Sequence, residues 1–207
     1  MTVIAVDGPA ASGKGTLARR LAAHYGLRHL DTGLLYRAVA RRSERGGLDP
    51  VASAMALSLA DLADPALREE GAAQAASRVA VIPEVRRALS ELQRRFAAEP
   101  PGAVLDGRDI GTVVFPVAEV KIFVEASVEA RAKRRHGELL EQGVASIYSR
   151  VLQDMRERDA RDRGRDIAPL TPAKDALVVD SSALDAEGVF SLVVAHITRI
   201  LPNLARG

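Results

Sequence analysis

Nine residues near the amino terminus have the types and the spacing of a phosphate-binding loop. The segment fits the pattern GxxxxGK and consists of Gly8, Pro9, Ala10, Ala11, Ser12, Gly13, Lys14, Gly15 and Thr16. Its glycines allow backbone conformations in which successive N–H groups point at one anion. The apolar run Val3–Val6 precedes the loop and an alanine- and leucine-rich stretch follows it, so the positive end of a helix dipole should face the same anion.

Two side chains of this loop add chemistry to the cradle. Lys14 can reach the terminal phosphates of a nucleotide, and a hydroxyl near it can meet a magnesium ion. In this chain Gly15 follows the lysine and the hydroxyl comes one place later, at Thr16. The alternative is an ordinary glycine turn, but strand, glycines, lysine and helix fall here in the order that a phosphate loop requires.

A second group of polar residues follows the short run Arg28–Leu30, which we expect to form a strand. In segment 31–37 (DTGLLYR), Thr32 is expected to cap a helix. Arg37 lies one turn into that helix, from where it can reach back toward an anion. The alternative is a capped helix with Tyr36 in the core and Arg37 in solvent.

A third group, segment 106–109 (DGRD), follows the apolar run Ala103–Leu105. A carboxylate at the end of such a strand, here Asp106, is where phosphate-loop enzymes hold magnesium directly or through water. Arg108 should emerge beside the first loop. A plain Asp-Gly turn is the alternative.

Arginines and carboxylates alternate along segment 156–166 (RERDARDRGRD). The pairs that fall four residues apart are Glu157–Arg161, Arg158–Asp162 and Asp159–Arg163. Such pairs would stabilise a solvated helix by a few tenths of a kcal/mol each. Beside a phosphate loop, the segment also fits a mobile lid whose arginines neutralise a phosphoryl group in transfer. The preceding helix would add Arg131, Arg134 and Arg135, of which Arg131 and Arg135 share one face.

Short apolar runs alternate with helical patterns along the chain, as βαβ units require. The expected strands are Val3–Val6, Arg28–Leu30, Ala103–Leu105, Val120–Val124 and Leu177–Val179. The expected helices are Lys14–Tyr25, Gly33–Arg45, Ala52–Ala63, Pro83–Ala98, Val128–Glu141, Ser146–Arg161 and Ala186–Ile200. The strands are apolar on both faces, as in a buried parallel sheet. The pattern predicts a doubly wound α/β fold with ligands at the carboxyl ends of its strands.

Composition excludes several classes of protein. The 207 residues include no cysteine, so a disulfide framework and a thiolate metal site are excluded. A net charge of +2 and an aromatic content of 3% argue against nucleic-acid binding. The early first strand leaves no room for a signal peptide and no apolar run approaches a membrane span, so we expect a cytoplasmic protein. The four histidines share no metal-ligand spacing and are expected to be incidental surface or packing residues.

Four linked motifs resemble those of the bacterial cytidylate kinases, which belong to the nucleoside monophosphate kinases. The motifs are GPAASGKGT, DTGLLYR, DGRDIGTVVFP and RDARDRGRDIAPL, and the resemblance runs from Thr2 to about Ile200. It implies a P-loop NTPase-type sheet of five parallel strands, and phosphorylation of CMP and dCMP with ATP and Mg²⁺. It also implies one kinase domain over residues 1–207, with a helical acceptor-binding region over about 38–86 and an arginine-rich lid over about 127–170. We expect a monomer that acts on small nucleotides, with no nucleic-acid or membrane partner.

The resemblance implies a role for each group of residues. Loop 8–16 would hold the phosphates of ATP, Lys14 would contact the transferring group, and Thr16 and Asp106 would support magnesium, directly or through water. The residues around the acceptor nucleotide would be Thr32, Tyr36, Arg37, Ser77, Arg86, Arg108, Asp109, Arg158, Asp162 and Arg165. The residues that close over the reaction centre would be Arg131, Arg135, Arg158, and Arg161 or Arg163.

Three of these residues would select the base. Cytosine presents an amino donor beside two acceptors, so its pocket needs a facing acceptor and a strong donor. Arg86 would donate, while Asp162 or the Ser77 hydroxyl would accept. Without the resemblance, Ser77 is a small helix residue and Arg86 a surface charge.

The chain departs from the family pattern in one region, and two other functions stay open. Most members carry a small β-rich excursion after the DTGLLYR motif, whereas residues 38–73 here have two helical stretches with a break at Pro65. One rival is another kinase of this fold, acting on UMP, AMP or dephospho-coenzyme A. The other is a nucleotide switch or regulatory ATPase, which the many arginines beside a second phosphate position disfavour.

Overall fold

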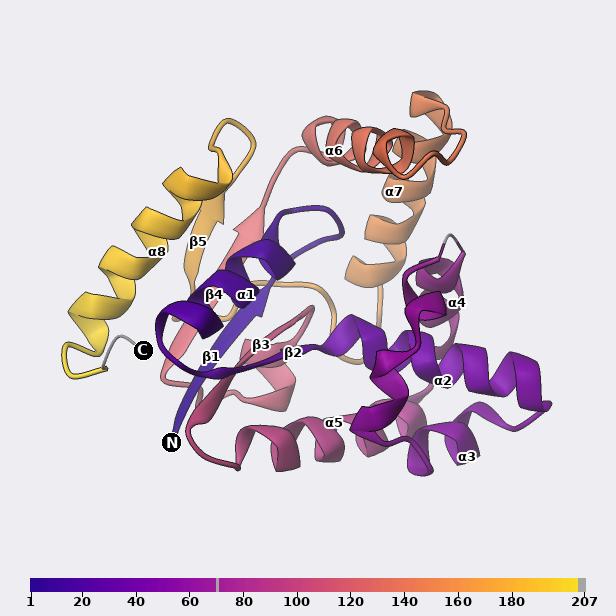
Figure 1. Cartoon of the computed structure of the whole chain (residues 1–207), viewed down its shortest axis with the longest axis horizontal. Helices are drawn as coiled ribbons and strands as arrows, with labels where there is room; N and C mark the ends of the chain where they lie inside the picture. Colours follow the sequence, from indigo (N-terminus) through magenta and orange to yellow (C-terminus); the bar gives the residue numbers. More distant parts are fainter. Residues whose placement is uncertain (70, 205–207) are drawn as a thin grey trace.

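Five parallel strands form the centre of the molecule in the computed structural model, which describes residues 1–69 and 71–204 (Figure 1). The strands are β1 (Thr2–Asp7), β2 (Arg28–Asp31), β3 (Gly102–Gly107), β4 (Val120–Glu125) and β5 (Leu177–Asp180). Their order in the sheet is β2-β3-β1-β4-β5, and every neighbouring pair is parallel. The chain adds β2 and β3 on one side of β1, and β4 and β5 on the other side. Ligands are expected at the carboxyl ends of the strands where this order changes, which are β1 and its neighbours.

The helices cover both faces of this sheet. The α-helices are α1 (Lys14–His24), α2 (Thr32–Gly46), α3 (Pro50–Met55), α4 (Ala72–Val79), α5 (Pro83–Ala97), α6 (Val128–Glu141), α7 (Tyr148–Arg163) and α8 (Ala186–Ile200). The shorter helices are η1 (Leu59–Ala63), η2 (Pro65–Arg68) and η3 (Ile110–Val114). No described helix is long and apolar enough to cross a membrane.

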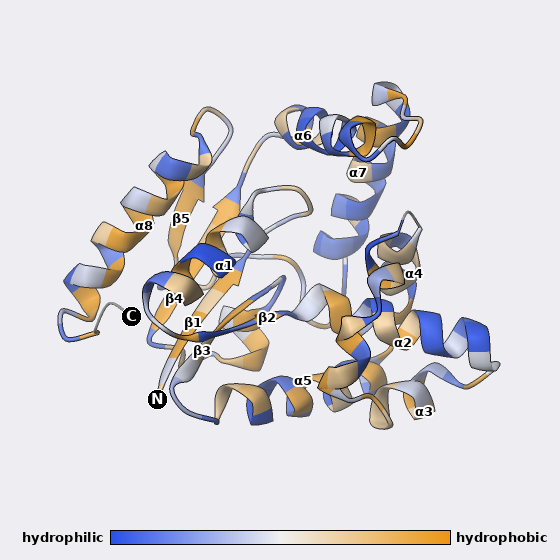
Figure 2. Cartoon of the chain, in the orientation of Figure 1, coloured by the Kyte–Doolittle hydropathy of each residue, from blue (hydrophilic) through white to orange (hydrophobic). Residues whose placement is uncertain are grey.

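Alternation along the strands divides the core into two layers. Ala5 of β1 packs in the cluster that contains residues of α2 and α5, whereas Ile4 and Val6 pack with residues of α1 and α8. All three side chains are fully buried. Strands β1, β4 and β5 are accordingly mostly hydrophobic in Figure 2, while most of α7 is hydrophilic. The sheet is thus held rigidly on both sides, and its carboxyl edge is left for the site.

The five expected strands are confirmed, and two expectations for the helices need correction. The expected helix Ala52–Ala63 is wrong, because the chain leaves the helical path after Met55. Ser58 and Asp61 then form a capping box that starts the separate helix η1. Helix α4 was not expected, although three of its residues at helical spacing, Ala75, Ala76 and Val79, are buried.

The α6–α7 pair stands above the carboxyl edge of the sheet, and α4 faces it across a gap between the ribbons (Figure 1). The pair has a small core of its own, formed by Ala132, Leu139, Val151 and Met155, and Ala11 packs against it. On the opposite side, residues 38–69 and 71–86 contain no strand among the described residues. Helices therefore carry most of the side chains that face the sheet edge from both sides.

Candidate active site

The loop between β1 and α1 is shaped by three unusual backbone conformations. Gly8 has a φ of 152°, and a Cβ placed there would lie 2.1 Å from the carbonyl oxygen of Val124. Gly13 and the non-glycine Ala11 are left-handed, with φ of 88° and 56°. A residue such as Ala11 persists there only where its surroundings fix it. The turn is therefore specified by backbone geometry, as a loop whose N–H groups surround an anion must be.

A hydroxyl from the far edge of the sheet braces this loop. Ser181, which follows β5, has its Oγ atom 2.9 Å from the carbonyl oxygen of Ser12 and 3.0 Å from that of Glu125. Arg134 of α6 donates to the same hydroxyl at 3.1 Å and also to the Ser181 carbonyl. The phosphate loop, the end of β4 and the residue after β5 are thereby tied to the middle of α6.

Lys14 is the first residue of α1 and lies where two cavities meet. Its Nζ atom donates weakly to the carbonyl oxygen of Pro9, at 3.4 Å. Burial, together with the nearby charge of Arg108, lowers the pKa of Lys14 to about 7. A buried lysine with so low a pKa is typical of a functional site, and a bound anion would favour its charged form.

The acceptor cavity, of about 180 Å³, lies between α2, α4, α5, α7 and the end of β3. The predicted acceptor residues that line it are Thr32, Tyr36, Arg37, Ser77, Arg86, Arg108, Asp109, Arg158, Asp162 and Arg165. Lys14, Gly15, Asp31 and Asp106 complete its floor. Residues from position 32 to position 165 therefore converge on one space.

One wall of the acceptor cavity is a buried ion pair. The Arg86 guanidinium pairs with Asp109 and donates to the carbonyl oxygen of Ala80 at 3.1 Å. The ring of Tyr36 lies 5.8 Å from the same guanidinium. Burial raises the pKa of the Tyr36 hydroxyl to about 12, so this wall offers a neutral hydroxyl and a fixed cation.

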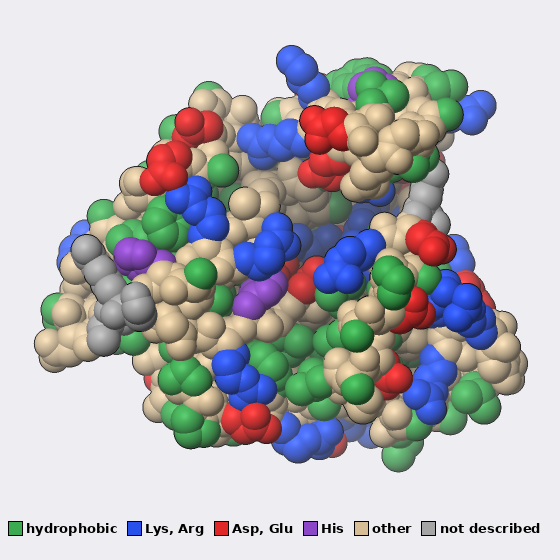
Figure 3. All heavy atoms as spheres, viewed as in Figure 1, with side chains coloured by type: hydrophobic (Ala, Val, Ile, Leu, Met, Phe, Trp, Pro, Cys, Tyr) green, Lys and Arg blue, Asp and Glu red, His purple; other side chains and the backbone are tan. Residues whose placement is uncertain are grey.

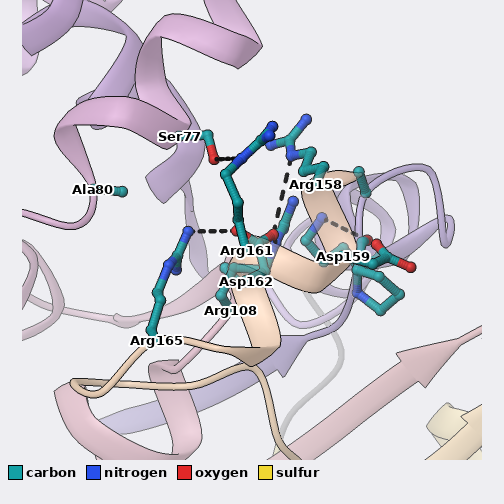
Figure 4. Close-up of polar contacts among 12 residues, drawn as sticks. Ser77, Ala80, Arg108, Arg158, Asp159, Arg161, Asp162 and Arg165 are labelled. Atoms are coloured by element: carbon teal, nitrogen blue, oxygen red, sulfur yellow. Dashed lines mark hydrogen bonds and ion pairs between the residues drawn. The ribbon is translucent and has the colours of Figure 1, made fainter. Parts of the chain in front are cut away.

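The opposite wall is organised by a single carboxylate. Asp162 of α7 accepts from Arg108 Nε at 2.9 Å and from Arg165, and Arg158 Nε lies 4.0 Å away (Figure 4). Burial opposes ionisation of Asp162, but the three guanidiniums outweigh it and lower its pKa. Burial lowers the pKa of Arg158 to about 9, and the charge of Arg108 adds to the effect. Of the three expected i,i+4 pairs, Arg158–Asp162 is the one found as an ion pair among the described residues.

The phosphate cavity, of about 280 Å³, adjoins the acceptor cavity under the α6–α7 pair. Its cationic lining residues are Lys14, Arg37, Arg68, Arg108, Arg135 and Arg158. Its acidic lining residues are Glu69, Glu138 and Asp154. In the space-filling view, Lys and Arg side chains gather around a hollow in this area (Figure 3). The excess of positive charge suits a polyphosphate.

Arg37 is held at the border of the two cavities. Its Nη1 atom donates to the carbonyl oxygen of Leu67 at 3.0 Å. Burial lowers the pKa of the guanidinium. Its helix α2 is capped by Asp31, which accepts from the N–H of Gly33 at 3.0 Å, so the expectation that Thr32 is the cap is wrong. Thr32 instead donates its hydroxyl proton to the carbonyl oxygen of Asp106 at 2.8 Å.

A third and larger cavity, of about 620 Å³, opens on the other side of the phosphate loop. It is lined by Ser12, Gly13 and Thr16, by Lys133 and Arg134 of α6, and by residues 181–186. We call it the donor-side cavity. Thr16 belongs to this cavity, where its hydroxyl accepts from Arg19 at 3.3 Å, and does not line the acceptor cavity beside Asp106.

The predicted metal residues supply few ligands of their own. Among the described residues, no group of three or more Asp, Glu, His or Cys side chains could hold a metal ion. Asp106 is buried at the floor of the acceptor cavity, and a Cβ on Gly15 would lie 3.5 Å from its Oδ2 atom. His29 donates to the other carboxylate oxygen at 2.8 Å, so this histidine is not incidental. The donor set fits a magnesium ion held mainly by phosphates, with one carboxylate from the protein.

The predicted lid arginines have different surroundings. Arg131 is 2% exposed and pairs with Asp159 through two contacts, of 3.1 and 2.6 Å. It also donates to the carbonyl oxygens of Ala126 and Ala10. Arg135 lines the phosphate cavity, and Arg163 is exposed at the end of α7.

Arg161 connects α7 to α4. Its Nη2 atom donates to the side-chain oxygen of Gln74 at 2.7 Å, and its Nε atom lies 3.5 Å from the Ser77 hydroxyl (Figure 4). This contact lies beside the Ser77 hydroxyl, to which the resemblance gives a role in recognising the nucleobase. Gln74 is absent from the predicted site, because its contact depends on two helices that are far apart in sequence.

Asp7 is the main polar residue of the site that sequence reasoning missed. Its carboxylate accepts from the N–H groups of Ile110 and Gly111, both at 2.8 Å, and so fixes the segment that follows Asp109. Burial raises the pKa of Asp7 to about 7, although the two N–H groups act in the opposite direction. A signal was present, since an acidic residue that ends a strand directly before Gly8 is a candidate anchor at a sheet edge.

A model of the cytidylate kinases matches residues 4–199 of the chain. The chain belongs to the cytidylate kinase family. Members of this family phosphorylate CMP and dCMP, and family membership implies the use of ATP. The cytidylate kinase of Paramagnetospirillum magneticum is 60% identical over 205 residues, which cover 95% of this chain and 97% of the relative. The cytidylate kinase of Methylocella silvestris is 54% identical over 211 residues, covering 99% and 98% of the two chains.

Solved structures support the fold at much lower identity. A sugar kinase from Janibacter sp. HTCC2649 superposes with a TM-score of 0.54 at 14% identity, covering 99% of this chain and 98% of the other. At this identity the similarity concerns the fold alone. It confirms the expected α/β fold, while the family assignment of the chain rests on the family model and the sequence relatives.

Proposed function

We propose that the chain transfers the terminal phosphoryl group of ATP to CMP or dCMP, with the acceptor in the acceptor cavity and the donor over loop 8–16. The observation that carries this assignment is the shared boundary of two cavities. Lys14, Arg37, Arg108 and Arg158 line both the acceptor cavity and the phosphate cavity. Two phosphorylated ligands bound there would present their phosphates to the same cations.

The reaction needs no general base from the protein. The nucleophile is an oxygen of the CMP phosphate, which is already an anion near neutral pH. A new bond forms between this oxygen and the γ-phosphorus, while the bond from the γ-phosphorus to the β,γ-bridging oxygen breaks and its electron pair leaves with ADP. Catalysis then consists of alignment and of charge neutralisation. We assign the neutralising role to Lys14, Arg135 and Arg158, and the acceptor phosphate to Arg37 and Arg108.

Base recognition is assigned to the far end of the acceptor cavity. Arg86 is fixed by Asp109 and can donate to an acceptor of cytosine, while Ser77 and Asp162 supply oxygens for its amino group. Because Asp162 is also the partner of three arginines, its carboxylate stays ionised and remains an acceptor. Uracil would meet these oxygens with a carbonyl and leave buried polar groups unpaired.

We assign Arg131 and Arg161 to positioning. Arg131 is occupied by Asp159 and by the carbonyl oxygen of Ala10 in the phosphate loop, so it would join the lid to that loop. Arg161 would hold α7 against α4 through Gln74. The exposed Arg163 would act only if α7 moved toward the nucleotides. Residues 127–170 would be the lid and residues 38–86 the acceptor region.

Magnesium is part of the proposal. A bound ion would neutralise phosphate charge and orient the phosphates of ATP. Asp106 would support it, directly or through water, with His29 holding the carboxylate in place. Thr16, which lines the donor-side cavity, would contact the phosphates of ATP there.

The acting unit is proposed to be a monomer in the cytoplasm, where its nucleotide substrates occur. Light scattering after gel filtration at micromolar protein should give the mass of one chain. The mass of a dimer would contradict the proposed monomeric state and leave the proposed reaction unaffected.

An acceptor screen tests the proposed function. ADP formation is measured with ATP, Mg²⁺ and one of CMP, dCMP, UMP, AMP or dephospho-coenzyme A. We expect ATP to be consumed rapidly with CMP and dCMP, poorly with UMP and hardly with AMP. Comparable efficiency with UMP would identify a broader pyrimidine kinase. Consumption of ATP without any acceptor would support a switch.

A further inference from the structure

We propose that Arg68, at the end of η2, is a further catalytic residue that contacts the phosphoryl group while it is transferred. This inference rests on the proposed function and adds a residue to it. Arg68 lies outside the motifs discussed above and in the region where the chain departs from most of its family. It lines the phosphate cavity with Lys14, Arg135 and Arg158 but does not line the acceptor cavity.

The position of Arg68 is fixed by its neighbours in η2. Asp64 caps this short helix by accepting from the N–H of Ala66 at 2.9 Å, and Arg41 donates to the same carboxylate at 2.8 Å. Leu67 is 1% exposed and lies in the core cluster with residues of α2 and α5. The residue before Arg68 is therefore anchored, and the arginine must leave the core on the side of the cavity.

The same short helix also holds Arg37. The carbonyl oxygen of Leu67 accepts from Arg37 Nη1 at 3.0 Å. Arg68 is the next residue, so η2 braces one phosphate ligand through its backbone and presents another through a side chain. The charge of Arg68 is among those that lower the pKa of Arg37, which indicates that the two guanidiniums share one electrostatic environment. Two cations held close together are stabilised by an anion between them.

Other arginines of the acceptor region are engaged elsewhere. Arg86 is paired with Asp109 inside the acceptor cavity, Arg41 with Asp64, and Arg78 with Glu44. Arg45 lines a separate cavity between α2 and η1. Apart from Arg37 of the DTGLLYR motif, Arg68 is thus the cation from this side of the molecule that lines the phosphate cavity, among the residues that the structure describes.

The location predicts which kinetic constant depends on Arg68. The phosphate cavity is bounded by the phosphate loop and by α6 and α7, so its contents are complete only when both nucleotides are bound. An interaction made with the group in transfer, and absent from either binary complex, lowers the barrier without changing substrate affinity. Arg68 should therefore act on kcat, and little on the KM values or on the binding of CMP alone.

The test compares Arg68→Ala, Arg68→Lys and the control Arg45→Ala, which removes the same charge from the same region. We expect kcat of Arg68→Ala to fall at least about 10-fold, at the lower end of the range for one electrostatic donor because the side chain is exposed. KM for CMP and for ATP should stay within about 3-fold, Arg68→Lys should recover part of the loss, and Arg45→Ala should match the parent. All three melting temperatures should be close to that of the parent.

Calorimetric binding of CMP alone to the parent and to Arg68→Ala completes the test. Affinities within about 3-fold of each other would support a role in the transfer step. A kcat for Arg68→Ala within 2-fold of the parent, or a loss of CMP affinity as large as the loss in kcat/KM, would overturn the proposal. Failure of the proposed function would appear differently, because the parent itself would then not turn over CMP.

Discussion

The two sides of the active site prepare for anions by different means. On the proposed donor side, the conformations of Gly8, Ala11 and Gly13 shape the phosphate loop, whose backbone N–H groups would supply the contacts. On the acceptor side, buried carboxylates hold guanidiniums in place, with Asp109 against Arg86 and Asp162 against its arginines. A backbone site tolerates changes of side chain wherever the conformation is kept. A site of ion pairs fails when one partner is removed, because the other charge stays buried.

The largest effect is expected from Asp162→Ala. The substitution leaves Arg108, Arg158 and Arg165 without their shared carboxylate, so the free energy of unfolding should fall by about 3–5 kcal/mol. Urea unfolding followed by circular dichroism measures this loss, with the exposed Glu157→Ala on the same helix as the control at within about 0.5 kcal/mol. A loss below 1 kcal/mol would mean that solvent or helix rearrangement compensates the arginines. The acceptor side would then depend on its ion pairs no more than the donor side does.

Lys14→Ala tests whether the backbone of the phosphate loop suffices without the lysine of that loop. We expect kcat to fall about 10²-fold or more, since Lys14 should stabilise charge that develops on the transferred group. Steady-state rates with CMP and ATP measure this, and the exposed Lys174→Ala serves as the control. Turnover within a few-fold of the parent would remove Lys14 from the mechanism.

Arg37→Ala and Arg108→Ala test whether the acceptor side serves CMP alone. Each substitution should raise KM for CMP about 10-fold or more and change KM for ATP much less, as expected for one charged hydrogen-bonding partner. Arg37 gives the cleaner result, because Arg108 also neutralises Asp162. Equal effects on both substrates would contradict the division into two sides.

The smallest effect concerns stability and pH. Burial lowers the pKa of Lys14 to about 7 in the folded protein, whereas the lysine of the unfolded chain keeps its ordinary, higher pKa. Below pH 7 the lysine is therefore charged in both states, and its buried charge destabilises the fold. Lys14→Met should therefore raise the melting temperature of the ligand-free protein at pH 7. The advantage should shrink as the pH rises toward 10, where the lysine is neutral in the fold. Calorimetric scans at three pH values measure it, and an advantage independent of pH would place its origin in packing.

The sequence predicts the sheet and the polar residues at its carboxyl edge because both depend on local patterns. Four of the strands are short and mostly apolar runs, whereas β2 has a single apolar residue, Leu30. Asp31 ends β2, Asp106 lies near the end of β3, and Arg108 directly follows β3. The break after Met55 is less visible, since Ser58 and Asp61 end one helical pattern only by starting another. Thr32 and Asp31 are both capping residue types, and the sequence does not decide between them.

Partners that come from distant segments could not be predicted. Arg131 and Arg135 share a helix face in the sequence pattern, yet Arg131 pairs with Asp159, 28 residues away, and Arg135 lines the phosphate cavity. The contact of His29 with Asp106 depends on the pairing of β2 with β3. Periodicity specifies which residues lie on a face, whereas the tertiary arrangement decides what that face meets.

The hydroxyl of Ser181 has a mechanical consequence. It joins the phosphate loop to the end of β4, while the Ser182 hydroxyl accepts from the N–H of Ser127, which directly precedes α6. This end of the α6–α7 pair is thereby fixed to the sheet edge, and the 16 residues of α7 form a helix about 24 Å long. In the proposed lid, a small rotation about this fixed end would displace the arginines of α7 by a larger distance. Removing the hydrogen bonds of Ser181 would therefore make the positions of the α7 arginines less well defined, although Ser181 does not contact them.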